Sequence, residues 1–144
     1  MKINVKKLNH NAIIPTRGTE QAVGYDLYAC IDSPVTIPAH STQKIGTGLA
    51  IEIPEGYGGF LFARSGLACK EGLAPANKVG VIDPDYRGEF IVALHNHTSK
   101  AKLIMPKTRI AQLAIIQCAV ADFKEVDDIS ETKRGDGGFG STGR

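Results

Sequence analysis

The chain has 144 residues, of which 42% are hydrophobic and 22% are charged, and its formal net charge at pH 7 is +2. This length suits one domain that buries about two-thirds of its unfolded surface. So small a net charge excludes the strong electrostatic field of a protein that binds nucleic acid or a membrane surface. No apolar run approaches the ~20 residues that span a bilayer, and no signal-peptide pattern opens the sequence.

The three cysteines, Cys30, Cys69 and Cys118, form no CxxC pair. Each lies among apolar neighbours, a pattern typical of buried and reduced thiols. Reduced thiols are the rule in a reducing compartment, so we expect a cytoplasmic protein.

The N-terminal half indicates short strands separated by turns. In residues 2–8, Ile3 and Val5 alternate with polar side chains, which predicts a half-buried strand. Residues 9–19 form a predicted loop. Further strands are predicted at residues 22–31, 35–38, 43–53 and 57–62.

One short helix is predicted between the strands, over residues 65–72. Ser65 can cap its N-terminus and Gly72 can end it, which leaves barely two turns. Later strands are predicted at residues 90–97, 103–105 and 109–120. Strands about ten residues apart with turns between them favour an all-β fold, a jelly-roll-like sandwich or barrel.

The composition changes near the C-terminus. From Ser130 onward the chain is rich in glycine and has a single phenylalanine, so it cannot build a core. We therefore predict a β jelly-roll domain over residues 1–129 and a flexible arm over residues 130–144.

The stretch 80–90, Gly-Val-Ile-Asp-Pro-Asp-Tyr-Arg-Gly-Glu-Phe, carries a dense cluster of reactive side chains. Pro84 fixes φ for a turn and restricts the backbone of Asp83 before it. We expect a β-hairpin that displays two carboxylates, a tyrosine and an arginine at its tip. An ordinary turn rich in aspartate and proline is the alternative reading of this stretch alone.

Two other stretches suit a phosphate ligand. Residues 64–66, Arg-Ser-Gly, stand where the helix is predicted to begin, and a helix N-terminus offers unpaired N–H donors and positive potential. An N-cap beside a surface arginine explains them equally well. Residues 109–112, Arg-Ile-Ala-Gln, open the last strand, and Gln112 can donate to a phosphate oxygen or simply be solvated at the sheet edge. Strand alternation would place Arg109 and Gln112 on opposite faces.

The segment 137–143, Gly-Gly-Phe-Gly-Ser-Thr-Gly, combines glycines with hydroxyl groups as a phosphate loop does. It is not a Walker A sequence, because no Gly-Lys-Ser/Thr and no preceding strand are present. A disordered tail is the alternative. Its single aromatic residue, Phe139, suits stacking on a base as the arm closes.

His95 and His97 lie on one face of a predicted strand and form a candidate metal pair. No cysteine or carboxylate at a suitable spacing completes a metal site. Structural histidines are therefore the favoured reading, and no Ser/His/Asp pattern supports nucleophilic catalysis.

Five stretches stand out when the whole chain is read: residues 22–27, 64–68, 80–89, 109–112 and 134–143. Together they resemble the five ordered motifs of the trimeric dUTPase family, with similar spacing over nearly the whole chain. The resemblance implies a homotrimer of jelly-roll subunits that uses Mg²⁺ to hydrolyse dUTP to dUMP and pyrophosphate. It also implies three active sites, each assembled from all three chains, in an enzyme that keeps uracil out of DNA and supplies dUMP for dTMP synthesis.

The resemblance implies a role for each matched residue near the substrate's base and sugar. Asp83 matches the general base, a carboxylate that orients and deprotonates the attacking water and touches the sugar 3′-hydroxyl. Tyr86 matches a ring that packs under deoxyribose and leaves no room for a 2′-hydroxyl. The uracil-reading edge matches Asn77, Val79 and Gly80.

The remaining matches concern the phosphates and the metal. The phosphate cradle matches Arg64, Ser65, Gly66 and Gln112. The arm that closes over the base and the terminal phosphate matches Arg134, Phe139, Ser141 and Thr142. Asp26 matches the aspartate of the first motif, which is expected to support the metal–water network or to hydrogen-bond to the second motif. Mg²⁺ is expected to be held mainly by substrate phosphates and water, without an assigned protein ligand.

Two positions depart from the family pattern. Ala63 stands where the family usually has a proline, which implies a less rigid turn into the helix. Residues 74–78, Ala-Pro-Ala-Asn-Lys, lack the usual Asn-Ser/Ala-Pro-Gly form around Asn77.

Two alternative functions remain open from the sequence. A dCTP deaminase-like enzyme would share the fold but needs a catalytic glutamate, and residues 82–86 argue against it. A non-catalytic, nucleotide-binding regulatory trimer would not need Asp83.

Overall fold

The computed structural model of the protein describes residues 1–138, which form an all-β fold with one short helix. No helix within these residues is long and apolar enough to cross a membrane. The elements in chain order are β1 (Val5–Lys7), β2 (Thr16–Arg17), β3 (Tyr25–Tyr28), β4 (Val35–Ile37), β5 (Thr42–Gly46), β6 (Leu49–Ile51), β7 (Tyr57–Phe62), α1 (Ser65–Glu71), β8 (Leu73–Pro75), β9 (Gly80–Ile82), β10 (Ile91–Asn96), β11 (Lys102–Ile104) and β12 (Arg109–Gln117).

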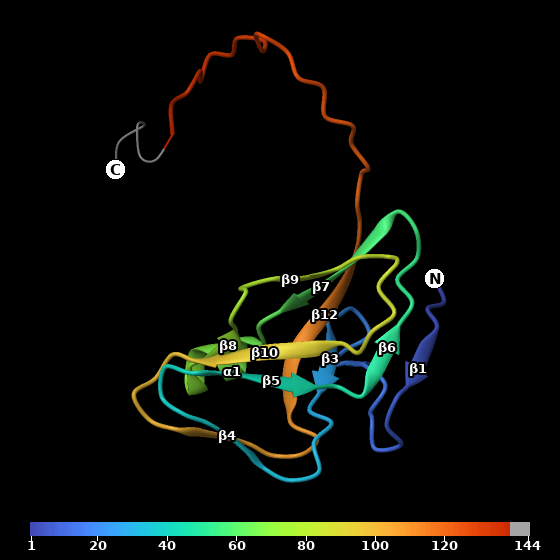
Figure 1. Cartoon of the computed structure of the whole chain (residues 1–144), viewed down its shortest axis with the longest axis vertical. Helices are drawn as coiled ribbons and strands as arrows, with labels where there is room; N and C mark the ends of the chain where they lie inside the picture. Colours follow the sequence, from blue (N-terminus) through green and yellow to red (C-terminus); the bar gives the residue numbers. More distant parts are fainter. Residues whose placement is uncertain (139–144) are drawn as a thin grey trace.

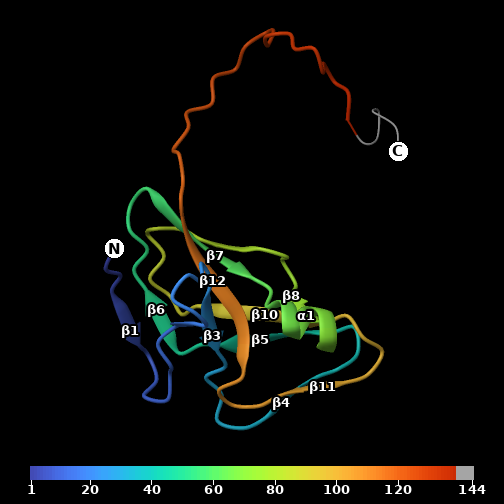
Figure 2. The same ribbon diagram turned by 180° about the vertical axis from the view of Figure 1, so that it is seen from behind.

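Two sheets form the layers of the fold. The larger sheet has the strand order β2-β3-β12-β7-β9, and the smaller has the order β5-β10-β8. The strands β5 and β10 lie in front in Figure 1, whereas β12 and α1 lie in front in the reversed view of Figure 2. The pairs β1-β6 and β4-β11 complete the body, and all these pairings are antiparallel. This is the all-β, jelly-roll-like architecture that the strand spacing predicts.

The core lies between the layers and is built from alternating residues of the strands. Along β10, Val92, Leu94 and Asn96 are buried while Ile91 is exposed, which is the two-residue period predicted for this strand. Phe90, immediately before β10, is fully buried. Other apolar side chains with exposed fractions of 1% or less are Leu27, Ile37, Ile45, Leu49, Ile104, Ile110 and Ala111.

The predicted helix forms, but it begins differently from the prediction. Ser65 is its first helical residue, and Arg64 occupies the N-cap position with an extended backbone and no side-chain cap. The capping role predicted for Ser65 is therefore wrong. The other end is as predicted, because Gly72 has a φ of 65° and its N–H donates to the carbonyl of Ala68.

The hairpin predicted for residues 80–90 is wrong. Strand β9 pairs with β7 in the larger sheet, whereas β10 pairs with β5 and β8 in the smaller sheet. The chain crosses between the layers because Phe90 is bonded to the corner between β5 and β6. Its N–H donates to the carbonyl of Leu49, and its carbonyl accepts from the N–H and the hydroxyl of Thr47. Asp83 therefore lies on a crossing loop, residues 83–89, and not at a hairpin tip.

Three smaller predictions also need correction. The strand predicted over residues 43–53 is divided into β5 and β6 at Gly48, whose φ of 68° interrupts the extended backbone. The loop predicted over residues 9–19 contains β2, which pairs with β3. The cysteines are free, but burial is only partial for Cys30 and Cys118, and Cys69 is exposed.

Asn96, fully buried at the end of β10, provides a test of the core. Its Nδ2 donates to the carbonyls of Ile37, Pro38 and Lys100, and its Oδ1 accepts from the N–H and the hydroxyl of Thr98. Asn96→Ala removes these five hydrogen bonds, although the Thr98 hydroxyl and the Lys100 carbonyl keep the bond between them. We expect the free energy of unfolding to fall by about 2–3 kcal/mol, measured by chemical denaturation at a fixed protein concentration.

Asn11→Ala serves as the matched control, because Asn11 is exposed. Its effect is expected to stay within about 0.5 kcal/mol. An Asn96→Ala protein as stable as this control would contradict the structural role given to Asn96.

Candidate active site

A pocket of about 440 Å³ lies at one end of the larger sheet. Its walls come from the loop before β3, from β3, from the start of α1 and from the start of β12. Its polar lining residues include Asp26, Arg64, Ser65, Gly66, Arg109 and Gln112. The structure thus brings together the whole predicted phosphate cradle and the supporting aspartate from segments far apart in the sequence.

The carboxylate of Asp26 fixes two guanidinium groups in this pocket. The Nε of Arg64 donates to Oδ1 at 2.7 Å, and an Nη of Arg109 donates to Oδ2 at 3.1 Å. Arg64 also donates to the carbonyl of Arg109 at 3.2 Å. The Asp26 side chain is only 14% exposed, so its charge is paired where water is scarce. Two cations against one carboxylate leave a net positive charge, which suits an anionic ligand.

Gln112 lies in the same pocket as Arg109, contrary to the prediction that they face opposite ways. A register shift in β12 directly after Arg109 places two buried residues in succession and displaces the alternation. Gln112 Nε2 donates to the carbonyl of Ala63 at 2.9 Å. Its side chain also lies close to Gly24, where an added Cβ would require the Gln112 amide to shift.

Arg109 is a candidate site residue that sequence reasoning missed. The alternation of a regular strand predicts that Arg109 points away from Gln112. The sequence contains no clear signal for the bulge in β12 that brings the two side chains into one pocket. Its side chain is 49% exposed, so guanidinium N–H groups not bonded to Asp26 remain accessible to a ligand.

Ser65 and Gly66 form the rim of the pocket at the start of α1. Both residues are exposed, and the hydroxyl of Ser65 is not used as a helix cap. A Cβ added at Gly66 would meet nothing within 4 Å, so the rim is open. The Ser65 hydroxyl and the backbone donors beside it are therefore accessible to a ligand.

A second cluster lies on the crossing loop around Asp83. Asp83, Tyr86 and Glu89 line a pocket of about 210 Å³. Asp83 is exposed, and none of the ion pairs formed within residues 1–138 involves it. The hydroxyl of Tyr86 donates to the carbonyl of Glu89 at 3.0 Å, and its ring packs so closely on Gly88 that only glycine fits. A carboxylate without a cationic partner and a fixed aromatic ring therefore stand side by side.

The predicted base-reading residues lie at the start of β9. Asn77 and Gly80 are adjacent in space, because a Cβ added at Gly80 would lie 3.3 Å from Asn77 Nδ2. A tight turn connects them, in which the N–H of Val79 donates to the carbonyl of Asn77 at 2.7 Å and Lys78 has a φ of 65°. Strand β9 is the last in its sheet, so one edge of its backbone is unpaired within the described residues.

The Asp83 cluster and the phosphate pocket lie at opposite ends of the larger sheet. Gln112 pairs with Phe62 at the pocket end. Ile82 pairs with Gly59, so Asp83 continues toward the level of Gly58. From residue 62 to residue 58 the strand advances four residues, which is about 13 Å. One chain therefore presents the two clusters at separate places.

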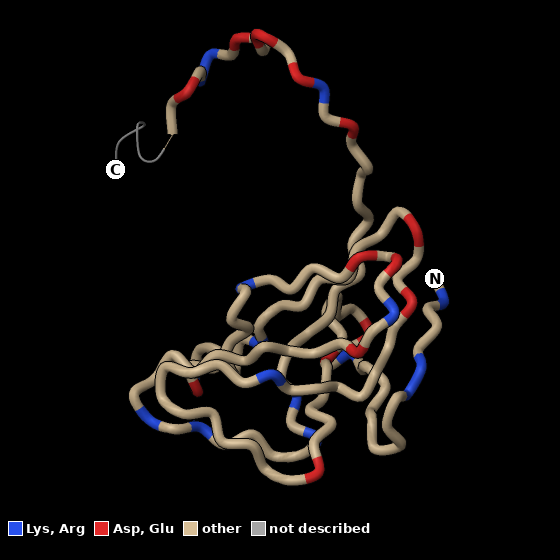
Figure 3. The backbone as a smooth tube through the Cα atoms, viewed as in Figure 1, with Lys and Arg blue, Asp and Glu red and all other residues tan. Residues whose placement is uncertain are grey.

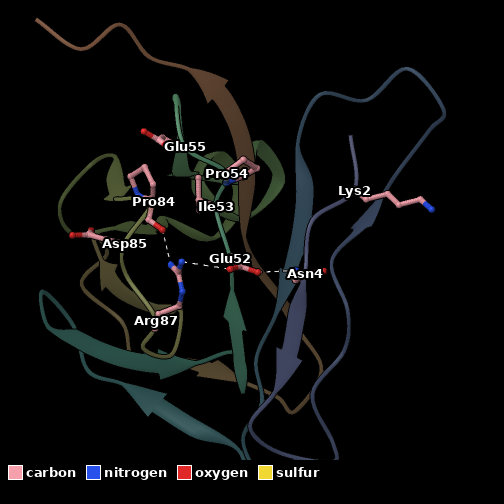
Figure 4. Close-up of a pocket in the computed structure, with 9 residues that line it drawn as sticks. All are labelled: Lys2, Asn4, Glu52, Ile53, Pro54, Glu55, Pro84, Asp85 and Arg87. Carbon is pink, nitrogen blue, oxygen red and sulfur yellow. Dashed lines mark hydrogen bonds and ion pairs between the residues drawn. The ribbon is translucent and has the colours of Figure 1, made fainter.

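A third pocket, of about 570 Å³, contains neither Asp83 nor Tyr86. It lies on the outer side of the crossing loop, where Arg87 extends between Pro84 and Glu52 (Figure 4). Arg87 donates to the carbonyl of Pro84 and lies 3.5 Å from Glu52, which also accepts from Asn4. These groups form hydrogen bonds and an ion pair with one another, and none of the predicted site residues lines this pocket.

The arm is described only in part. Arg134 Nε donates to the carbonyl of Gly137 at 2.8 Å. The predicted residues Phe139, Ser141 and Thr142 lie outside the described residues.

The histidine pair lies away from both clusters. The rings of His95 and His97 are 4.5 Å apart, and His95 Nδ1 is 2.9 Å from the hydroxyl of Thr42. Desolvation, followed by the charges of His95, Lys78 and His40, lowers the pKa of His97. No group of three metal-binding side chains occurs within residues 1–138.

Comparisons with known proteins agree on one family. The family model for dUTPase matches residues 10–143. The deoxyuridine 5′-triphosphate nucleotidohydrolase of Nautilia profundicola is 47% identical over the full length of both chains. That of Desulfitobacterium hafniense is 50% identical over 131 residues, which cover 90% of this chain and 87% of the relative.

Solved structures show the same fold. The dUTPase of Staphylococcus bacteriophage 80alpha, in complex with dUpNHpp, superimposes with a TM-score of 0.91 at 29% identity, covering 99% of each chain. A mutant dUTPase of Staphylococcus aureus phage phi11, in which a structural Mg(II) ion is coordinated, gives a TM-score of 0.80 at 25% identity over 89% of this chain and 98% of that one. With the motif residues gathered as described and relatives aligned end to end, the chain belongs to the dUTPase family.

Proposed function

We propose that this protein hydrolyses dUTP to dUMP and pyrophosphate by attack of water on the α-phosphate. The observation that carries the proposal is the exposed Asp83 carboxylate, which has no cationic partner within residues 1–138 and stands beside the fixed ring of Tyr86. A carboxylate held in this way can accept a proton from water. Membership of the dUTPase family supplies the substrate class.

Asp83 acts as the general base. As the water oxygen bonds to the α-phosphorus, one of its protons passes to the Asp83 carboxylate and the bond to the bridging oxygen breaks. Pyrophosphate leaves with the electron pair of that bond. General-base assistance of this kind is worth roughly 10²–10⁴-fold in rate, so most of the remaining acceleration comes from positioning and charge stabilisation.

The pocket around Asp26 supplies charge stabilisation. Arg64 and Arg109 are held in place before substrate arrives, and the Gln112 amide and Ser65 hydroxyl lie beside them. Donors that need no rearrangement stabilise developing negative charge efficiently. Arg134 of the arm, with Phe139, Ser141 and Thr142, completes the enclosure of the terminal phosphate and the base.

Mg²⁺ is the proposed cofactor. This small, hard cation prefers oxygen ligands and usually keeps several waters while binding substrate phosphates and one or two carboxylates. The residues of the site fit such binding. The carboxylate of Asp83 is exposed, whereas that of Asp26 is already paired with two arginines, which leaves phosphates and water as the main ligands. Bound mainly to phosphates and water, the ion would neutralise charge on the triphosphate as pyrophosphate leaves.

Base and sugar selection falls to β9 and the crossing loop. The backbone at Val79 and at Gly80, where β9 begins at the edge of its sheet, can with the Asn77 amide match the donor and acceptor groups of uracil. The ring of Tyr86 is held by its hydroxyl and packs under deoxyribose, where a 2′-hydroxyl would collide.

The distance between the two clusters supports a homotrimer with shared sites. Within one chain, Asp83 and the phosphate pocket lie at opposite ends of the same sheet. A triphosphate that contacts Asp83 of one chain would therefore bind more readily in the phosphate pocket of a neighbouring chain. Residues 119–136 are exposed and extend away from the body, and they bear several acidic side chains (Figure 3). Val120, Phe123 and Ile129 are at least 87% exposed. We therefore place this segment against another subunit, with residues 130–144 as the closing arm of domain 1–129.

The reaction itself can be tested directly. Purified protein with Mg²⁺ is expected to release pyrophosphate from dUTP and not from dTTP, dCTP or UTP, because the base and the sugar are both read. Pyrophosphate and ammonia are measured in parallel for all four nucleotides. Ammonia from dCTP would assign the protein to the deaminases, and silence with all four would favour a regulatory binder.

The role of Asp83 predicts the effect of removing its charge. Asp83→Asn should lower kcat by about 10²–10⁴-fold, because an amide cannot take the proton. Binding of a non-hydrolysable dUTP analogue should change little, as measured by calorimetry. Asp85→Asn is the matched control, since Asp85 is exposed on the same loop, and its kcat should stay within about threefold of the parent. Turnover near the parental rate in Asp83→Asn would contradict the assignment.

A further inference from the structure

Glu89 ends the crossing loop and has no role in the account so far. Its Oε1 accepts the N–H of Gly48 at 2.7 Å. The side chain is half-buried, and none of the ion pairs within residues 1–138 includes it. Withdrawing a carboxylate from water without a cationic partner costs free energy, which suggests that the position of Glu89 serves a function.

Two glycines receive the Glu89 carboxylate: Gly46 leaves room for it, and Gly48 donates a hydrogen bond to it. A Cβ at Gly46 would lie 2.5 Å from Oε1 and 3.2 Å from Cδ of Glu89. Gly48, with its φ of 68°, directs its N–H at the carboxylate, and a Cβ there would lie 2.7 Å from Cys30 Sγ and 2.9 Å from Ala12 Cβ. The corner between β5 and β6 is therefore shaped to receive this side chain.

Glu89 is connected to Asp83 through Tyr86. The hydroxyl of Tyr86 donates to the Glu89 carbonyl at 3.0 Å, and the N–H of Tyr86 donates to the Asp83 carbonyl at 3.2 Å. All three residues line one pocket. A shift of Glu89 would consequently move both the aromatic ring and the carboxylate beside it.

We propose that Glu89 is a positioning residue for the hydrolysis, which it serves by anchoring the crossing loop to the N–H of Gly48. The anchor holds Tyr86 under the sugar and Asp83 at the attacking water, and so the proposal rests on the role given to Asp83. The hydrogen-bond acceptor matters here and the negative charge does not, because an amide oxygen can accept the same N–H. The backbone bonds of Phe90 fix the end of the loop, and the Glu89 side chain adds an attachment one residue before it. A second side-chain attachment of the loop runs from Arg87 to Glu52, but both side chains are about half exposed, so this pair contributes little.

Substitutions on both sides of the anchor test the proposal. Glu89→Ala removes the acceptor, and Gly46→Ala fills the space that the carboxylate occupies. Each should lower kcat for dUTP by about 10–100-fold, because small displacements of a catalytic group have effects of this size. Glu89→Gln keeps an acceptor oxygen and should stay within about threefold of the parent. Glu89→Ala and Gly46→Ala break the same contact, so the kcat of the double variant should be little lower than that of either single variant.

Further readouts separate positioning from a general structural role. Glu52→Ala, which removes the second attachment of the same loop, should leave kcat within about threefold. The impaired variants should keep the parental oligomeric state and a Tm within about 5 °C. Parental kcat in Glu89→Ala and Gly46→Ala would overturn the proposal, as would equal losses in Glu89→Gln and Glu89→Ala or a loss matched by unfolding. None of these outcomes decides whether Asp83 is the general base, because Asp83→Asn tests that role separately.

Discussion

The register of β12 is the constraint on which the rest of the site depends. This nine-residue strand is hydrogen-bonded on both sides, and its pairing sets Gln112 opposite Asp26 on β3 and opposite Phe62 at the end of β7. The bulge after Arg109 then turns that arginine into the same pocket. Because the side-chain period of a strand is two, a slip of one residue would remove Gln112 from the cradle and take Arg109, one of its two guanidinium partners, away from the Asp26 carboxylate.

The same sheet explains why the chemistry is divided. The cradle is built on paired strands and on two arginines that the Asp26 carboxylate holds in place, so its side chains are positioned before substrate arrives. The Asp83 loop leaves the sheet at the opposite end and crosses to the other layer, where backbone bonds of Phe90 and the side chain of Glu89 hold it. In the proposed reaction the cradle binds phosphates and the Asp83 carboxylate, which forms no ion pair within residues 1–138, activates the water, so the proposal needs a second chain to bring the two together.

The sequence predicts the strands better than it predicts their partners. Alternation along β10 and the αL glycine at the end of α1 are local features, and both predictions are confirmed. Whether β9 pairs with β10 depends on Phe90 and its bonds to the β5-β6 corner, which no local pattern reveals. The side-chain direction predicted for Arg109 is wrong for a similar reason, because it is set by a bulge in β12 that no local pattern reveals. The motif residues were found only because five weak patterns occur in order, and their assembly in space required the fold.

Subunit complementation tests the shared site most directly. Asp83→Asn and Arg64→Ala should each be inactive alone, because one lacks the base and the other lacks a phosphate ligand. When a 1:1 mixture reassembles at random, roughly three quarters of the trimers are hybrids, and each hybrid should have one site that combines Asp83 of one chain with Arg64 of a neighbour. About one quarter of all sites in the mixture should then be intact, so activity should return to about that fraction of the parental rate. Hybrid trimers that form, as shown by mass spectrometry, but remain as inactive as either variant would show that each chain carries its own complete site and would contradict the account.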